Sequence, residues 1–211
     1  MGASSFIQIP EPVDPHLRRW MMFVDGENLA IRAQQFAAKQ SGLKLTEGTH
    51  YLKDVFVWLP GLSATDAFLN LPGVRIQRHA IRSYYYTSVV GDAVRIQSVK
   101  AALWDLGFHP EVFKKTRKED KAKGVDISLA KDLLSHAFLN NLDVAVLVAG
   151  DGDYAPLVEA VERLGKVVYG VFFSEGLSPE LKFAADKFVD SEWDSFFSAR
   201  WGGLSNSGRT T

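Results

Sequence analysis

The sequence predicts an α/β protein in which a mainly parallel central sheet lies between two layers of helices, a three-layer α/β/α arrangement. Short apolar runs alternate with segments of helical periodicity along most of the chain. The clearest run, Val144–Val148, is continuous and rich in β-branched residues, as buried parallel strands are. A candidate helix separates most runs, which implies right-handed crossovers and helices on both faces of the sheet.

The strands are predicted from apolar runs bounded by turn residues. These runs are Trp20–Val24, Val55–Leu59, one or two strands within Val74–Thr87, Phe108–Phe113, Val144–Val148 and Val167–Phe173. Pro60-Gly61 stops the second run, where a turn is expected. The triplet Tyr84–Tyr86 within the third run should place its first and last rings on one face of the sheet and its middle ring on the other.

The helices are predicted from apolar spacing and from residues that favour helix ends. They are Leu29–Lys39, Ala93–Leu106, Ile127–Phe138, Tyr154–Leu164 and Pro179–Ala185. Gly107 and Gly165 follow two of them, as C-terminal glycines do, and Ser178 precedes a proline at the start of the last. The buried stripe of the third helix is predicted to consist of Ile127, Ala130, Leu134 and Ala137.

Composition indicates one globular domain and excludes several kinds of site. The chain has 211 residues, 46% hydrophobic and 23% charged, and a formal net charge of -1, so nucleic acid would have to bind through a local patch. It has no cysteine, which excludes disulfides, thiolate zinc sites and cysteine nucleophiles.

The chain is predicted to have an extended arm over 1–18, a domain over 19–198 and a flexible tail over 199–211. It shows no signal-peptide pattern and no apolar run near the ~20 residues of a membrane span. We therefore expect a cytoplasmic protein without membrane contact, and the sequence leaves homo-oligomerisation open.

Two acidic clusters directly follow predicted buried strands. Asp25 follows the first strand, and Gly26 after it permits a tight turn. Asp25 and Asn28 are equally interpretable as turn and helix-cap residues. Asp151 and Asp153 alternate with glycines after the Val144–Val148 strand. A turn needs only one acid, and two adjacent carboxylates repel each other unless a cation such as a divalent metal lies between them.

A third acidic site opens the predicted helix after Lys123. Asp126 begins this helix, and by itself an N-cap is the simpler interpretation. Asp132 lies six residues on, too far round the helix to share a metal with Asp126, so a supporting role is expected for it. Because ligands of such sheets bind beyond the carboxyl ends of the strands, the three acidic sites can converge on one crevice. That crevice would suit metal-assisted phosphoryl transfer.

Three motifs together resemble the NYN domain, in particular its bacterial LabA/DUF88-like branch, related to PIN and FLAP nucleases. They are Val24-Asp25-Gly26-Glu27-Asn28-Leu29, then Lys123-Gly124-Val125-Asp126 with Ala130 and Asp132, then Gly150-Asp151-Gly152-Asp153-Tyr154 with Pro156-Leu157. The resemblance covers residues 20–190 and implies a PIN-like sandwich with metal-dependent ribonuclease activity. It implies that a Mg²⁺ or Mn²⁺ ion is held by Asp25, Asp126, Asp151 and Asp153, with Asn28 beside them.

RNA, single-stranded in preference, is the expected partner, and two basic clusters are candidates for contacting it. The predicted contacts are Arg78, Arg82, Lys114, Lys115, Arg117, Lys118 and Lys123. The second cluster, within Lys114–Lys123, is more typical of a solvated loop. The Tyr84–Tyr86 rings could stack on bases, although at least one of them is expected to belong to the core. Two alternatives to a ribonuclease remain: a non-catalytic RNA- or protein-binding module, and a phosphohydrolase of small phosphorylated molecules.

Overall fold

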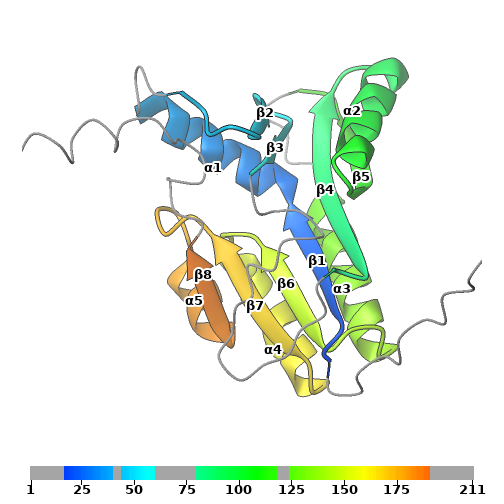
Figure 1. Ribbon diagram of the computed structural model, residues 1–211, viewed down its shortest axis with the longest axis vertical. Coiled ribbons are helices and arrows are strands. Elements are labelled where there is room, and N and C mark those ends of the chain that lie inside the picture. The colour runs from blue at the N-terminus through cyan, green and yellow to red at the C-terminus, as the bar shows by residue number, and fades with distance from the viewer. Residues whose placement is uncertain (1–16, 40–43, 60–78, 118–123, 191–211) are drawn as a thin grey trace, which may run out of the picture.

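A computed structural model describes residues 17–39, 44–59, 79–117 and 124–190, which form a six-stranded parallel sheet between two layers of helices (Figure 1). The strand order is β5-β4-β1-β6-β7-β8, and every neighbouring pair runs parallel. The predicted three-layer α/β/α class is therefore confirmed.

The elements have the following bounds. The sheet consists of β1 (Trp20–Asp25), β4 (Arg82–Val90), β5 (His109–Lys115), β6 (Val144–Val148), β7 (Val167–Phe172) and β8 (Lys187–Asp190). The helices are α1 (Gly26–Lys39), α2 (Ala93–Asp105), α3 (Val125–Phe138), α4 (Ala155–Arg163) and α5 (Pro179–Ala184), with a short 3-10 turn, η1 (Gly152–Tyr154). A separate antiparallel hairpin consists of β2 (His50–Leu52) and β3 (Phe56–Trp58).

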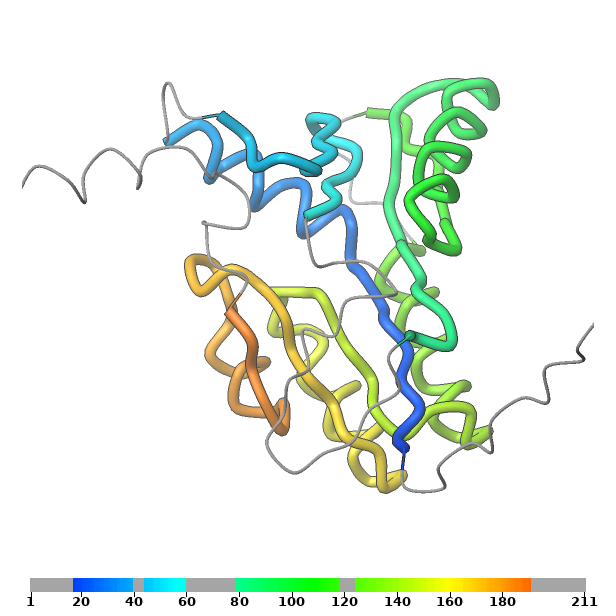
Figure 2. Tube along the Cα trace, viewed as in Figure 1, coloured from blue at the N-terminus to red at the C-terminus, as the bar shows by residue number. Residues whose placement is uncertain are grey.

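Strand β1 lies at the centre of the sheet because both of its faces are apolar. All six of its residues are buried. Met22 and Val24 belong to the core beneath α1, α2 and the hairpin, whereas Phe23 belongs to the core beneath α3 and α4. Figure 2 shows α1 leaving β1 beside the hairpin, on the other side of the sheet from α3 and α4. A strand covered on both sides requires such a continuous apolar sequence.

The strand order reverses next to β1. The chain moves outward from β1 through β4 to β5, then crosses to β6 on the other side of β1 and continues to β7 and β8. In sheets of this order, ligands bind in the crevice beyond the carboxyl ends of the two strands at the reversal. Those strands are β1 and β6, and they end at Asp25 and Val148.

The buried stripe of α3 differs from the predicted one. Ile127 and Leu134 are 72% and 40% exposed. The buried residues of the helix are Val125, Leu129, Leu133 and Ala137. These residues are spaced by four and therefore lie on one side of the helix. Both sets of residues have the spacing of a buried helix face, and packing against the sheet determines which set is buried.

Other differences lie at the ends of elements and at the edge of the sheet. The sequence does not predict strands β8 and β2, because both are short and neither contains a fully buried residue. Strand β5 extends through Lys115, so Lys114 and Lys115 belong to a strand rather than to the predicted loop. Apart from residues 17 and 18, the predicted arm and tail lie outside the described residues, as do Pro60-Gly61 and the start of the Val74–Thr87 run. Among the described helices, none has the length and apolar character to cross a membrane.

Candidate active site

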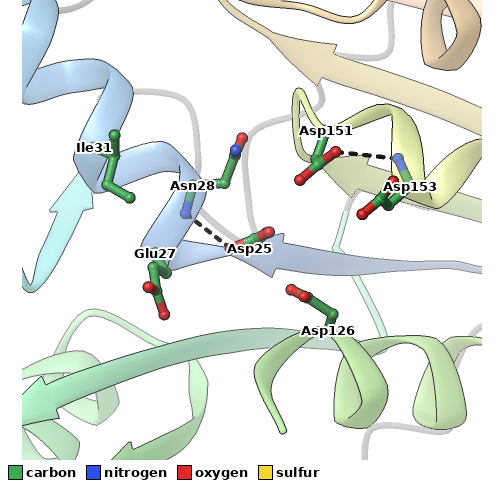
Figure 3. Close-up of a pocket in the computed structure, with 7 residues that line it drawn as sticks. All are labelled: Asp25, Glu27, Asn28, Ile31, Asp126, Asp151 and Asp153. Carbon is green, nitrogen blue, oxygen red and sulfur yellow. Dashed lines mark hydrogen bonds between the residues drawn. The ribbon is translucent and has the colours of Figure 1, made fainter. Parts of the chain in front are cut away.

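The carboxyl ends of β1 and β6 and the start of α3 surround one cavity of about 170 Å³. It is lined by Asp25, Glu27, Asn28, Ile31, Asp126, Asp151 and Asp153. Figure 3 shows the four aspartates approaching a common space from β1, from α3 and from the turn after β6. Five of these seven residues are acidic, and no lysine or arginine is among the described residues that line the cavity.

Asp25 is the fixed member of this group, with 4% of its surface exposed. Its Oδ1 accepts a hydrogen bond from the backbone N–H of Asn28 at 2.9 Å, which caps the first turn of α1. Burial raises the pKa of Asp25 to about 7, although hydrogen bonds from Asn28 and Tyr154 lower it, and the nearby Asp126 and Glu27 carboxylates raise it further. The cap interpretation is therefore correct for one oxygen of Asp25, and Oδ2 is used elsewhere in the site.

Asn28 ties the two acid-bearing strand ends together and does not cap its own helix. Its Oδ1 accepts a hydrogen bond from the backbone N–H of Gly150 at 3.0 Å. Gly150 directly precedes Asp151, and a Cβ at Gly150 would lie 2.2 Å from the ring of Phe172. The close approach of this turn to the sheet therefore depends on glycine, and the amide of Asn28 sets its position relative to β1.

Tyr154 joins two of the acids, and its position in the site was not predicted. Its hydroxyl oxygen lies 3.0 Å from Asp25 Oδ2 and 3.0 Å from Asp126 Oδ1. Burial raises the pKa of Tyr154, and the two carboxylates raise it further, so the phenol keeps its proton. One phenol proton can be donated to only one carboxylate at a time. Tyr154 therefore links Asp25 of β1 to Asp126 of α3, because both carboxylates lie within hydrogen-bond distance of its hydroxyl.

Asp126 occupies the second position of α3 and is not its N-cap. Gly124 is the N-cap residue, with φ of 129° and no side-chain cap bond. The exposed Asp126 carboxylate lies in the first turn, where the helix dipole favours negative charge. Asp132 does not line the cavity, and its Oδ2 accepts a hydrogen bond from the hydroxyl of Tyr86 at 3.0 Å. The two acids of α3 therefore face different neighbours, as their spacing indicates.

Asp151 and Asp153 lie on the exposed rim of the cavity, at the start of η1. Oδ1 of Asp151 accepts a hydrogen bond from the backbone N–H of Asp153 at 3.1 Å, so Asp151 is the N-cap of this turn. Both side chains are exposed. Since one acid caps the turn, the second carboxylate has no part in that cap and remains available to the cavity.

Glu27 also lines the cavity, but its charge is already paired. Its Oε1 forms an ion pair with Nζ of Lys115, and its Oε2 accepts a hydrogen bond from Oγ of Ser88 at 2.6 Å. The Lys115 side chain is only 10% exposed, so this is a largely buried pair. Glu27 therefore serves as a wall of the cavity, whereas the four aspartates have no basic partner among the described residues that line it.

None of the predicted RNA-contacting residues that the structure describes lines the cavity, although Lys115 is paired with Glu27, which does. Arg82 begins β4, four register positions before Tyr86, the partner of Asp25, which places it about 13 Å away along the strand. The other predicted contacts are Lys114, Lys115 and Arg117, on or just after β5, and Arg78, Lys118 and Lys123, outside the described residues.

The donor chemistry of the cavity fits a divalent cation. Carboxylate oxygens are the ligands that Mg²⁺ and Mn²⁺ prefer. Within the described ranges, no three acidic or histidine side chains stand close enough together, as placed, to hold one ion. Asp126, Asp151 and Asp153 are exposed and can rotate without disturbing the core, although Asp126 would then exchange its hydrogen bond with Tyr154, and Asp151 its cap bond, for the ion. The residues thus fit a cation by type and by location, with Asp25 as the member that does not move.

The fold and the cavity define an α/β protein with an acidic crevice at the reversal point of a parallel sheet. The NYN domain family matches residues 19–192, so the chain belongs to this family, which falls within the PIN-like nuclease superfamily. The structure is similar to that of a protein of unknown function from Vibrio parahaemolyticus. That similarity has a TM-score of 0.56 at 21% identity and covers 87% of this chain and 98% of the other, which shows a shared fold. No curated protein matches the chain.

Tyr154→Phe is expected to lower the free energy of unfolding at pH 8 by about 1–3 kcal/mol, because the buried Asp25 carboxylate loses a hydrogen-bond donor while the ring is retained. Urea unfolding measures this change. Tyr169→Phe is the matched control, since Tyr169 is also buried and its hydroxyl has no hydrogen bond within the described structure. Equal effects of the two substitutions would show that the Tyr154 hydroxyl does not hold the acids.

Proposed function

We propose that this protein is a metal-dependent ribonuclease of the LabA/DUF88-like branch, which hydrolyses phosphodiester bonds of single-stranded RNA with Mg²⁺ or Mn²⁺. One observation carries the proposal. Aspartates from three separate parts of the chain line a single cavity, and no basic side chain lies between them among the described residues. Because like charges repel, such a cluster is stabilised most simply by a cation shared between the carboxylates.

The residues that would hold the cation are Asp25, Asp126, Asp151 and Asp153. A divalent ion supplies charge neutralisation at a phosphate and lowers the pKa of a water molecule. The protein supplies positioning. Asp25 is buried and hydrogen-bonded at both oxygens, and Asn28 fixes the turn that presents Asp151. The exposed rim leaves room for a polymer to approach, since Asp151 and Asp153 are both accessible.

The exposed rim of the site and its charge support a polymeric phosphodiester as the substrate. An acid-lined cavity repels phosphate in the absence of a cation, so binding of the nucleic acid should depend on metal. Basic side chains at the end of β5, where Lys114 is exposed, lie on the same chain segment as the ion-paired Lys115. A strand of RNA that crosses the cavity towards β5 would gain these contacts.

Asp151→Asn is expected to lower kcat/KM for Mn²⁺-dependent cleavage of single-stranded RNA by at least about 100-fold, because it removes a charge from the metal site. The fold should be kept, since asparagine can still accept the cap hydrogen bond from Asp153. Cleavage of a labelled oligonucleotide measures the rate, and thermal unfolding checks the fold.

Asp105→Asn serves as the control, because Asp105 is an exposed acid at the end of α2, away from the cavity. Equal cleavage by wild type and Asp151→Asn would overturn the site. Turnover of nucleotides without cleavage of RNA would identify a small-molecule phosphohydrolase, and RNA binding without any turnover would identify a non-catalytic module.

A further inference from the structure

A second cavity is lined in part by Ser88 and Lys115, the two residues that bind the carboxylate of Glu27. It has a volume of about 250 Å³ and is lined by Asp54, Val55, Ser88, Val90, Arg95 and Lys115. These residues come from the β2–β3 hairpin, the end of β4, the first turn of α2 and the end of β5. Its lining contains two basic residues, in contrast to the acidic cavity, which has none among the described residues.

Glu27 connects the linings of the two cavities through its hydrogen bonds to Ser88 and Lys115. Its side chain lines the acidic cavity, and Figure 3 shows its carboxylate turned away from Asp25. On its far side this carboxylate binds Ser88 Oγ and Lys115 Nζ, and both of these residues line the second cavity. The two cavities are therefore linked through contacts between the side chains of Glu27, Ser88 and Lys115.

The walls of the second cavity are held firmly in place. Thr87 Oγ1 donates a hydrogen bond to the carbonyl oxygen of Val55 at 2.6 Å, which fixes the hairpin to β4. Arg95 lies across Gly91, where an added Cβ would meet the Arg95 Cβ and Cγ at 2.9 Å. Gly91 has φ of 154°, a conformation that side chains rarely adopt, so glycine at this position leaves the space that the start of the Arg95 side chain occupies.

Arg95 supplies a cation that no acid neutralises among the described residues. Within the described ranges its guanidinium makes no ion pair, whereas Lys115 is paired with Glu27. A guanidinium next to an ammonium and a hydroxyl is a suitable arrangement for a phosphate group. Asp54, on the same cavity, would repel a free anion but can accept a hydrogen bond from a sugar hydroxyl or a base amino group. Val55 and Val90 add apolar surface, so the lining as a whole suits a nucleotide better than inorganic phosphate.

From this arrangement we infer that the second cavity binds the nucleotide next to the scissile phosphate, with Arg95 as the contact to its phosphate. The inference rests on the proposed ribonuclease function and adds a subsite to it. Lys115 contributes through Glu27: the ion pair holds the ammonium at the boundary, where it faces a phosphate passing between the two cavities.

The test uses an RNA oligonucleotide in which one phosphate at a time is replaced by a neutral methylphosphonate. The nucleotide on the 5′ side of the methylphosphonate carries a 2′-deoxyribose, because a 2′-hydroxyl would attack the linkage. The reference oligonucleotide has the same 2′-deoxyribose and a normal phosphate. In wild type, neutralising the phosphate next to the cut should lower kcat/KM by about tenfold. Arg95→Ala should lower kcat/KM on the reference oligonucleotide by a similar factor. The methylphosphonate at that position should then cause no further decrease in kcat/KM of the variant.

Lys100→Ala is the matched control, because Lys100 is on the same helix but does not line the cavity. It should show the wild-type sensitivity at every position. Arg95→Ala with undiminished sensitivity to the methylphosphonate would overturn the subsite, while cleavage that still depends on Asp151 would leave the ribonuclease proposal intact.

Binding decides the inference independently of turnover. In the Asp151→Asn background, the salt dependence of RNA binding should fall by about 0.7 in logarithmic slope when Arg95 is replaced by alanine, since one phosphate contact is lost. If the wild-type protein cleaves no RNA, the proposed function fails. An unchanged salt slope would then overturn the subsite as well, whereas the expected decrease would preserve it as a nucleic-acid contact.

Discussion

Asp25→Asn is expected to abolish RNA cleavage and at the same time to stabilise the metal-free protein above pH 7. Activity should fall by about 10³-fold, because the substitution removes the buried charge at the centre of the proposed metal site. The gain in stability follows from burial. A carboxylate that is 4% exposed and lies close to other acids is ionised at a cost in free energy, and an amide of the same shape avoids that cost.

The pH dependence of this effect follows from the direction of the pKa shift. Folding raises the pKa of Asp25 from 3.8 to about 7, so the native state binds its proton more tightly than the unfolded chain does. The contribution to stability is fully present below pH 4 and is lost as the pH rises to 7. The variant does not titrate at this position, so its advantage should be near zero at pH 4 and on the order of 2–4 kcal/mol at pH 8.

Urea unfolding in EDTA at several pH values between 4.5 and 8 measures the difference. Asp105→Asn is again the control, because its exposed carboxylate should change the unfolding free energy by less than about 0.5 kcal/mol. Adding Mn²⁺ should raise the melting temperature of wild type and much less that of Asp25→Asn. If Asp25→Asn were less stable than wild type at pH 8 in EDTA, the Asp25 carboxylate would stabilise the fold without a metal. That result would contradict its proposed role at the centre of a metal site.

The location of the acids can be predicted from the sequence because it depends only on strand ends. Asp25 follows an apolar run and Asp151 follows another, and the carboxyl ends of parallel strands meet at one edge whatever the strand order. A helix that follows a parallel strand begins at the same edge, so the rule also predicts Asp126 in this crevice, although its position within the first turn of α3 needed the structure.

The contacts between side chains could not be predicted, because they join residues far apart in the sequence. Tyr154 reaches Asp25 across 129 positions, and Lys115 reaches Glu27 across 88. In the sequence, Tyr154 looks like an ordinary first-turn aromatic residue, and Lys115 looks like one of a run of surface charges. The orientation of α3 was missed for a related reason. Two apolar stripes fit its sequence, and the sheet below it decides which is buried.

Gly26→Ala is expected to destabilise the protein by about 1–3 kcal/mol or more and to lower activity with it. A Cβ at Gly26 would lie 1.9 Å from Cε1 of the Tyr85 ring. That ring cannot move aside, because Tyr85 is fully buried and its hydroxyl binds both the N–H and the carbonyl of Val57 in the hairpin. The first turn of α1 would have to shift instead, and Asp25 would move with it.

Two further variants separate this steric effect from a general cost of replacing glycine. Gly170→Ala in β7 should be tolerated, since its Cβ would meet neighbours at ordinary contact distances of 3.5 Å and longer. Tyr85→Leu removes the obstructing ring, so adding Gly26→Ala to it should cost much less than the same change in wild type. Additive unfolding free energies in this cycle would show that Gly26 serves α1 alone. A strong coupling between the two substitutions would mean that the contact between Gly26 and the Tyr85 ring determines how closely α1 approaches β4, and hence where Asp25 lies.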